Sequence, residues 1–221
     1  EIKDFRAPRI EKQWMINHAW LKGWHNLKYN PQTRRLTWDE SDPLRFYVNM
    51  IYTIVRAIRA HVTKNQPRWS VDGLPYGSLD SEQSRNLSYY LESVFERLNL
   101  KRLVKCVVTY GLEYGVGIFQ YGYDENADGG EGNVWVEAPD PFDVYIDHLA
   151  GDISEARWVI KTMRKPISEL KKNPVYSGLD DLKGDSKISA SEYKNTLMQQ
   201  NFGADQPAQA KDSALLYEMW L

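Results

Sequence analysis

Apolar residues recur at helical spacing through the first half of the chain and predict a series of amphipathic helices. The first segment runs from Pro8 to about Leu27, with polar side chains between its apolar positions. Tyr29-Asn30-Pro31 is expected to end this helix, and Arg34–Trp38 to form a short strand or extended link. The apolar stripe of the first helix consists of Ile10, Trp14, Leu21 and Trp24.

A second helix has the most regular pattern of the chain. Asp42 is suited to cap its N-terminus, Pro43 to occupy its first helical position, and Asn65-Gln66-Pro67 to end it. Each buried side chain of its stripe would contribute roughly 1.5–3 kcal/mol before entropy is subtracted, so the stripe requires a partner surface in a core or an interface. The stripe consists of Leu44, Val48, Ile51, Val55, Ile58 and Val62. The residues expected on the solvent side of this helix are Arg45, Arg56, Arg59 and Lys64.

Two further helices are predicted before the composition changes. Asp80 and Gln83 have the spacing of a capping box at the start of the third helix. The fourth helix is expected to run from Leu100 to near Gly111. The apolar stripe of the third helix consists of Leu87, Leu91, Val94, Phe95 and Leu98. The charged side of the fourth helix consists of Lys101, Arg102 and Lys105.

From Gly111 onward, the chain is rich in glycine, tyrosine and β-forming residues. Strands are predicted at 116–123 and 134–138 around a turn-rich loop, at 157–163, and from 214 to 221, with a short helix opening at Pro166. The pattern therefore predicts an α+β fold in which several amphipathic helices pack with a small, mainly antiparallel sheet. The expected parts are a helical segment 1–65, an α+β core 66–182, a flexible polar loop 183–213 and the start of a further strand at 214–221.

Four aspartates in one short run are the strongest candidates for chemistry, namely Asp140, Asp143, Asp147 and Asp152. Converging carboxylates could hold a metal ion for a nuclease or phosphoryl-transfer reaction, with His148 as a further ligand. The intervening residues favour a structural role instead, because Pro141 keeps Asp140 out of the helical region and Val144-Tyr145-Ile146 is β-forming. In an extended run, Asp143, Tyr145 and Asp147 would share one face, and Val144 and Ile146 would be buried on the other. We therefore expect a short edge strand, with aspartates that end turns.

Charge, cysteine content and the length of apolar runs narrow the class of protein. Lys and Arg total 28 against 30 Asp and Glu, so a broad DNA-binding surface is not expected. The single cysteine, Cys106, excludes an intrachain disulfide and favours a reducing, intracellular environment. No apolar run approaches the ~20 residues that span a bilayer. The chain starts at Glu1 and stops within an apolar run at Leu221, so we expect a fragment of a longer protein.

Two loop motifs resemble ligand sites but favour turn chemistry. Asp124, Asn126 and Asp128 match the first half of a calcium-binding EF-hand loop, and a calcium-stabilised binding module is one alternative function. Trp135, however, stands where the loop needs its bidentate glutamate. The glycines at 111, 115 and 117 follow a helix and precede a strand, which is the reverse of a nucleotide-binding loop, so they are expected to end the helix and allow close packing.

Side chains that could act as nucleophiles or bases are dispersed along the chain. Cys106 lies within an apolar helical stretch, where a thiol is usually inert. The histidines are His18, His25, His61 and His148, and the first two are expected on one solvated helix face. The sequence predicts no catalytic, cofactor-binding or metal-binding residue and no enzymatic activity.

The order of these segments resembles the N-terminal part of tailed-bacteriophage portal proteins, or head–tail connectors, particularly those of short-tailed phages. The resemblance runs from Trp14 to about Pro174, and its motifs acquire specificity from their order and spacing. They are the tryptophan-rich first helix, Asn49 to Pro67 with Val55-Arg56-Ala57-Ile58, the helix around Leu91–Leu103, the Tyr110–Gly117 junction, a hairpin, Asp140–Asp147 and Ala156-Arg157-Trp158-Val159.

The resemblance implies a subunit of a ring, typically dodecameric, at one capsid vertex of the virion, with assembly in the host cytoplasm. Double-stranded DNA would be packaged and ejected through the ring without sequence-specific binding. The implied partners are other copies of the chain, the terminase motor, capsid and scaffolding proteins, and tail adaptor proteins, with no membrane and no cofactor. The segment would be mainly the outer wing. A conduit must let DNA slide, which is compatible with a net charge of −2.

Overall fold

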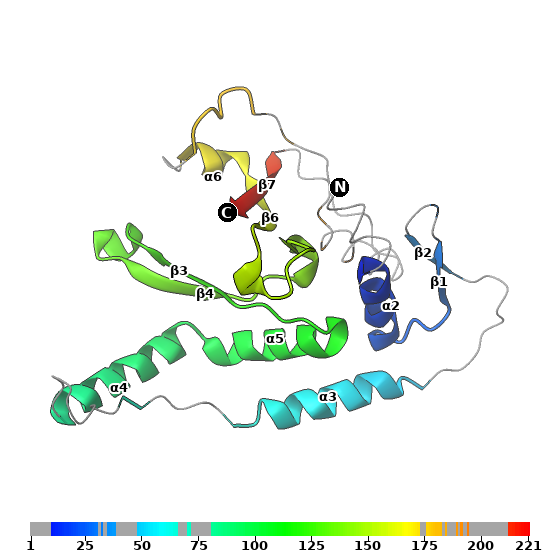
Figure 1. The fold of residues 1–221 in the computed structure, drawn as a ribbon, viewed down its shortest axis with the longest axis horizontal. Coiled ribbons are helices and arrows are strands. Elements are labelled where there is room, and N and C mark those ends of the chain that lie inside the picture. The colour runs from blue at the N-terminus through cyan, green and yellow to red at the C-terminus, as the bar shows by residue number, and fades with distance from the viewer. Residues whose placement is uncertain are drawn as a thin grey trace. The chain divides into compact units, whose positions relative to one another are not determined.

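The protein has the α+β fold that the sequence pattern predicts (Figure 1). The computed structural model describes residues 10–30, 32, 35–38, 48–65, 70–71, 81–172, 176–182, 184, 189, 191, 194 and 212–221. The chain divides into two compact units, Ala7–Pro139 and Asp140–Leu221. The division at Pro139 lies inside the segment 66–182 that we assigned to one core. Among the described helices, none is both long enough and apolar enough to cross a membrane.

The first helix of the Ala7–Pro139 unit is shorter than predicted. Helix α2 spans Lys12–Leu21, and Gly23 adopts a φ of +86°, the left-handed conformation with which glycine commonly ends helices. The chain then forms strand β1 (Leu27–Asn30), which pairs antiparallel with β2 (Arg35–Trp38). The expectation of a helix to Leu27 was therefore wrong, because Gly23 ends it earlier. Pro8, where we expected the helix to open, lies outside the described residues.

The second helix begins later than predicted. Helix α3 spans Met50–Val62, and the side-chain oxygen of Asn49 accepts a hydrogen bond from the Tyr52 N–H at 2.9 Å. The Asn49 amide also donates to the Leu21 carbonyl at 2.9 Å, so one side chain joins the start of α3 to the end of α2. Val48 precedes the helix and is exposed, which corrects its predicted place in the helical stripe. The predicted cap at residues 42–44 lies outside the described residues.

Helices α4 (Ser81–Arg97) and α5 (Leu100–Tyr114) are separated by a short bend. Asn99 forms it with a φ of 49°, a left-handed conformation that asparagine tolerates better than most residues. Helix α5 packs against α2, α3 and α4 and is the central helix of its unit. It continues past Gly111, where we expected its end, and stops at Gly115, which has a φ of 79° and donates its N–H to the Gly111 carbonyl at 3.0 Å.

The predicted hairpin follows α5. Strand β3 (Gln120–Asp124) pairs antiparallel with β4 (Asn133–Glu137), and β3 starts four residues later than the predicted strand at 116. Gly122 lies opposite Trp135, and a Cβ at Gly122 would come within 2.5 Å of the Trp135 ring. The glycine therefore provides the space in which the indole lies across the neighbouring strand.

The Asp140–Leu221 unit contains a three-stranded antiparallel sheet in the order β5-β6-β7. The strands are β5 (Val144–Ile146), β6 (Val159–Pro166) and β7 (Ser213–Trp220), and α6 (Ile167–Lys172) packs against β6. Phe142 and Leu170 are fully buried and form the centre of this core. The short strand β5 lies at an edge of the sheet, as the sequence predicted, and the strands predicted at 157–163 and 214–221 are present.

Replacing Gly117 with alanine is expected to destabilise the Ala7–Pro139 unit. A Cβ at this position would lie 2.5 Å from the backbone oxygen of Val107 on α5, a contact that only a backbone shift can relieve. We expect a loss of about 1–3 kcal/mol in the free energy of unfolding, measured by urea denaturation.

Gly111→Ala is the matched control for that variant. Nothing lies within 4 Å of a Cβ at Gly111, and the residue is inside α5. Alanine there is expected to stabilise the protein by about 0.5–1 kcal/mol. Equal stability of the Gly117→Ala variant and the wild type would contradict the close approach of residue 117 to α5.

Candidate functional site

The aspartate-rich run begins with a tight turn rather than a strand. Pro141–Asp143 forms a 3₁₀ turn, and Asp140 precedes it in an extended conformation, as a residue before proline should. The Asp140 Oδ1 atom accepts a hydrogen bond from the Phe142 N–H at 3.0 Å. Asp140 therefore caps the turn and directs the Phe142 side chain into the core.

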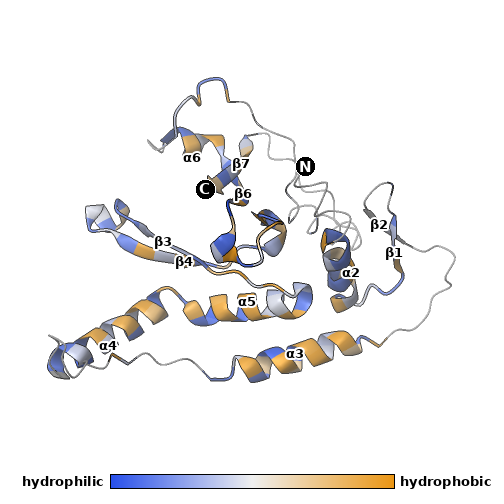
Figure 2. Cartoon of the chain, viewed as in Figure 1, coloured by the Kyte–Doolittle hydropathy of each residue, from blue (hydrophilic) through white to orange (hydrophobic). Residues whose placement is uncertain are grey.

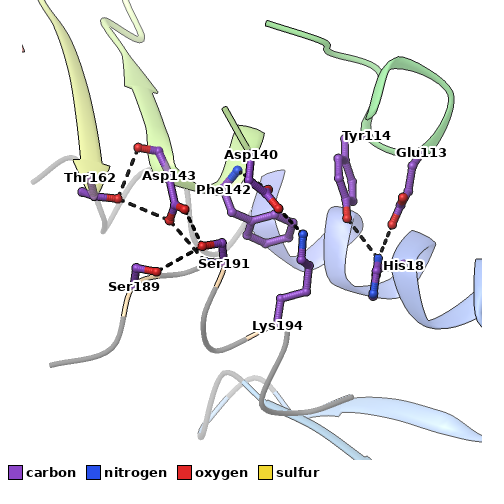
Figure 3. Close-up of polar contacts among 10 residues, drawn as sticks. All are labelled: His18, Glu113, Tyr114, Asp140, Phe142, Asp143, Thr162, Ser189, Ser191 and Lys194. Atoms are coloured by element: carbon purple, nitrogen blue, oxygen red, sulfur yellow. Dashed lines mark hydrogen bonds and ion pairs between the residues drawn. The ribbon is translucent and has the colours of Figure 1, made fainter. Parts of the chain in front are cut away.

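Asp143 is held by hydrogen-bond donors from two distant segments (Figure 3). The Thr162 hydroxyl of β6 donates to its backbone oxygen and to Oδ1, both at 3.3 Å. Ser191 donates its N–H to Oδ1 at 3.3 Å and its hydroxyl to Oδ2. Burial raises the pKa of the Asp143 carboxyl above its ordinary value of 3.8, while the Ser191 donors act in the opposite direction.

Asp140 forms an ion pair with Lys194. The Lys194 ammonium contacts Asp140 Oδ2 and lies 5.2 Å from the centre of the Phe142 ring, a cation–π arrangement (Figure 3). Sequence reasoning missed this contact because Lys194 lies in the polar segment 183–213, predicted as a flexible loop. Most of that segment is outside the described residues. A separation of 54 residues between the partners leaves no local signal in the sequence.

Asp147 is one of the most buried polar residues in the described part of the chain. It is 3% exposed, and its Oδ2 accepts a hydrogen bond from the Arg157 Nε–H at 2.8 Å while Oδ1 accepts from the Leu149 N–H at 3.1 Å. The Arg157 hydrogen bond lowers the pKa of Asp147 from 3.8 to about 2. Tyr145 is buried as well, so the predicted alternation of a polar and an apolar face is wrong. Val144 and Tyr145 are both buried, although neighbouring side chains of a strand point to opposite faces.

The aspartates therefore have separate partners instead of converging on one point. Asp140 binds Lys194, Asp143 binds Ser191 and Thr162, and Asp147 binds Arg157. Asp152 caps the turn at Ile153, whose N–H donates to its Oδ1 at 2.6 Å, and His148 is exposed. Within the described residues, no group of three or more His, Cys, Asp or Glu side chains is arranged to hold a metal ion.

The calcium-like loop of the hairpin forms turns through its own side chains. Asp124 Oδ1 accepts from the Asn126 N–H at 3.0 Å, and Asp128 Oδ2 accepts from the Asn133 side chain at 2.7 Å. Asp128 and Gly129 both have left-handed backbone conformations, with φ of 53° and 76°. The acidic residues of the loop thus support the tight connection between β3 and β4.

His18 occupies a buried cluster and not the solvated face that we expected. Its Nδ1 atom contacts the Glu113 carboxylate and lies 3.0 Å from the Tyr114 hydroxyl (Figure 3). His18, Glu113 and Tyr114 are all less than 10% exposed. The Asn17 side chain donates to the Glu113 carbonyl at 2.9 Å, so consecutive residues of α2 bind the last turn of α5. The spacing of residues in the sequence could not predict this contact, because it assigns His18 to a polar helix face and contains no information about a partner on another helix.

The other candidates have structural positions. Cys106 is half-buried on α5, and Gly115 and Gly117 end that helix and allow close packing, as predicted. Gly111 instead lies within the helix. His25 follows the end of α2 and is half-buried, which corrects its expected place on a solvated helix face.

One row of apolar side chains on α3 is exposed to solvent. Met50, Ile54, Ile58 and Val62 follow one another at four-residue spacing and are 60, 53, 43 and 57% exposed. We call these four residues the α3 ridge. Figure 2 shows hydrophobic residues along α3, and likewise on α4, where Leu87, Tyr90 and Leu91 are exposed. The inner face of α3, with Ile51 and Val55, is only half-buried against the rest of its unit. Of the stripe predicted for this helix, Ile51 and Val55 are half-buried, and Ile58 and Val62 are exposed on the α3 ridge. Met50 and Ile54 were not part of the predicted stripe.

No protein-family model matches the chain, and no curated protein matches it closely enough to be called a relative.

Acid is expected to weaken folding through Asp147. Because the pKa of Asp147 falls from 3.8 to about 2 on folding, the unfolded chain binds more protons between these values, and stability is lost as the pH falls through that window. Asp147→Asn should remove this part of the acid dependence, measured by urea denaturation at pH 6, 4, 3 and 2.5. Asp152→Asn, a change to an exposed turn cap, should retain it. An Asp147→Asn profile parallel to the wild type would contradict the assignment.

Removing His18 is expected to cost more stability than removing an exposed histidine. His18→Leu leaves the buried Glu113 carboxylate without its imidazole partner, and we expect a loss of about 3–5 kcal/mol in the free energy of unfolding. The double variant His18→Leu/Glu113→Met should recover much of that loss, since an apolar pair needs no such compensation. His61→Leu on the exposed side of α3 is the control. A double variant as unstable as the sum of its single variants would show that the pair is not coupled.

Proposed function

We propose that this chain is part of a structural subunit of a phage portal ring, through which DNA is packaged and ejected. The observation that supports the proposal most directly is the α3 ridge. Four large apolar side chains in a row on one helix are unfavourable in water, and large exposed apolar patches commonly mark interaction sites. In a ring, each subunit presents one surface to a different surface of its neighbour, and a helix face of this kind suits such a contact.

The order of the elements adds to this proposal. The tryptophan-rich helix, the regular second helix, the hairpin and the aspartate-rich turn and strand are the segments on which the resemblance to portal proteins rests. The partners proposed are other copies of the chain, the terminase motor, and capsid, scaffolding and tail adaptor proteins. DNA would pass through the ring without sequence-specific binding. The proposed location is one capsid vertex of the virion, and the proposed role is structural rather than enzymatic.

The geometry of the carboxylates does not favour the two alternative functions. A metal-dependent nuclease would need two or more of Asp140, Asp143 and Asp147 to point at one ion, but each is bound to a different partner. A calcium-stabilised module would need Asp124, Asn126 and Asp128 to face a common centre, but Asp124 and Asp128 accept hydrogen bonds that shape the loop.

Ring assembly is expected to depend on the α3 ridge. In the full-length protein, Ile54→Lys/Ile58→Lys places two charges on the ridge, and desolvating them in a subunit contact would be costly. We expect the wild type to form a closed oligomer of uniform mass by mass photometry, and the double variant to shift to monomers and small species. Both positions are already more than 40% exposed in the single chain, so the fold of the subunit should persist.

Ala60→Lys provides a matched control on the same helix. Ala60 is exposed and lies on the side of α3 opposite the ridge, so one added lysine there should leave the oligomer unchanged. Circular dichroism checks that both variants fold. A wild-type full-length protein that is a monomer or dimer would overturn the proposal. An intact ring in the ridge variant would show that α3 does not lie in the contact.

A further inference from the structure

One face of the β3–β4 hairpin exposes a group of large side chains. Tyr121 and Tyr123 are two residues apart on β3 and therefore lie on the same face, and Val134 of β4 is paired directly with Tyr123. These three side chains, which we call the hairpin face, are 79, 60 and 41% exposed. Tyrosine is enriched at protein contacts because its ring is apolar while its hydroxyl can stay hydrated.

The loop beyond this face is acidic, whereas α3 is basic. Between residues 118 and 137 the chain contains five acidic residues and no Lys, Arg or His, and the four acidic residues of the loop are Asp124, Glu125, Asp128 and Glu131. Between residues 50 and 64 it contains no Asp or Glu, and the basic residues are Arg56, Arg59, His61 and Lys64. His61 and Lys64 are exposed and lie at the C-terminal end of the α3 ridge.

The geometry of a ring requires the α3 ridge to meet a surface other than itself. A ridge that met the same ridge of a second copy would form a two-fold pair, which closes as a dimer. The exposed apolar part of α4 is less suited to the ridge because that helix mixes both charges, namely Glu82, Glu92 and Glu96 with Arg85 and Arg97. The hairpin face, by contrast, adjoins a loop of uniformly negative charge.

We propose that the hairpin face of one copy docks on the α3 ridge of the next copy in the ring. This inference rests on the proposed function and names the surface that the ridge meets. Both surfaces are exposed in the single chain, so neither is covered by its own subunit. The apolar side chains supply affinity, while the opposite charges select this pairing over contact between two ridges.

The spacing of side chains on the two surfaces is similar. Tyr121 and Tyr123 are separated by about 7 Å along β3, and successive residues of the ridge by about 6 Å along α3. The acidic loop follows Tyr123, just as Lys64 follows the ridge in the sequence. When β3 and α3 run in the same direction, the tyrosine rings therefore meet the ridge and the loop carboxylates meet Lys64.

The pairing is tested by reversing the charge of each surface in the full-length protein. Glu125→Lys/Glu131→Lys makes the loop less acidic at two exposed positions and leaves in place the hydrogen bonds of the loop aspartates. His61→Glu/Lys64→Glu makes the end of the ridge acidic. We expect each double variant to shift from the ring to monomers and small species in mass photometry, and the variant with all four changes to recover the mass of the wild-type ring.

An equimolar mixture of the two double variants gives a second readout. In an alternating ring, every contact between the two variants again combines favourable charges, so we expect the mixture to form rings that neither variant forms alone. Circular dichroism checks that each variant folds.

Tyr121→Ser tests the apolar part of the contact. We expect the protein concentration for half-assembly to rise about tenfold, the effect of losing a tyrosine that anchors an interface. Tyr89→Ser on α4 is the matched control, because Tyr89 is 64% exposed and lies outside both surfaces, and it should leave that concentration unchanged.

The outcomes separate this inference from the proposed function. A wild-type protein that forms no ring overturns both. A wild-type ring that persists in both double variants, that the four combined changes do not restore, or that Tyr121→Ser and Tyr89→Ser affect equally, leaves the proposed ring standing and overturns the pairing of the hairpin face with the α3 ridge.

Discussion

The burial of apolar helix faces is the constraint on which the rest of this structure depends. Helix α5 satisfies it by packing against α2, α3 and α4, and its ends are set by Asn99 and Gly115, which adopt left-handed conformations. Helix α3 satisfies it only in part. Its inner face meets its own unit, whereas the α3 ridge remains exposed in the single chain. The same physical requirement that assembles the Ala7–Pro139 unit therefore leaves the α3 ridge exposed, and the proposed portal ring would cover it with a neighbouring copy of the chain.

Polar contacts join specific positions of neighbouring elements, which apolar packing alone does not do. The His18 ring joins α2 to the last turn of α5, and Asn49 joins α3 to the end of α2, each through side chains that meet a specific acceptor. In the Asp140–Leu221 unit, three aspartates act in the same way, each with a different partner. The pKa values of Asp147 and Asp143 are shifted in opposite directions. A hydrogen bond from Arg157 lowers the pKa of one, and burial raises the pKa of the other.

Local patterns predicted the elements, while contacts between distant residues decided the details. The α+β class, the hairpin around residue 128, the edge strand β5 and the turn-capping aspartates all follow from spacing and residue type within a few positions. The end of α2 also has a local cause, because Gly23 adopts the left-handed conformation. The prediction extended the helix to Leu27 because it followed the helical spacing of apolar residues and gave too little weight to this glycine. The burial of His18 and the contacts of Lys194 do not have local causes. Their partners lie 95 and 54 residues away, beyond the reach of periodicity.

The central claim is that the exposed α3 ridge belongs to a contact between neighbouring subunits of a portal ring. Electron microscopy of the purified full-length protein tests this claim most directly, because a ring viewed along its axis shows its rotational symmetry without any assumption about mass. The account predicts class averages of closed rings with a central channel, and α3 at the contact between adjacent subunits. Particles without rotational symmetry, or rings in which the α3 ridge faces solvent, would contradict it.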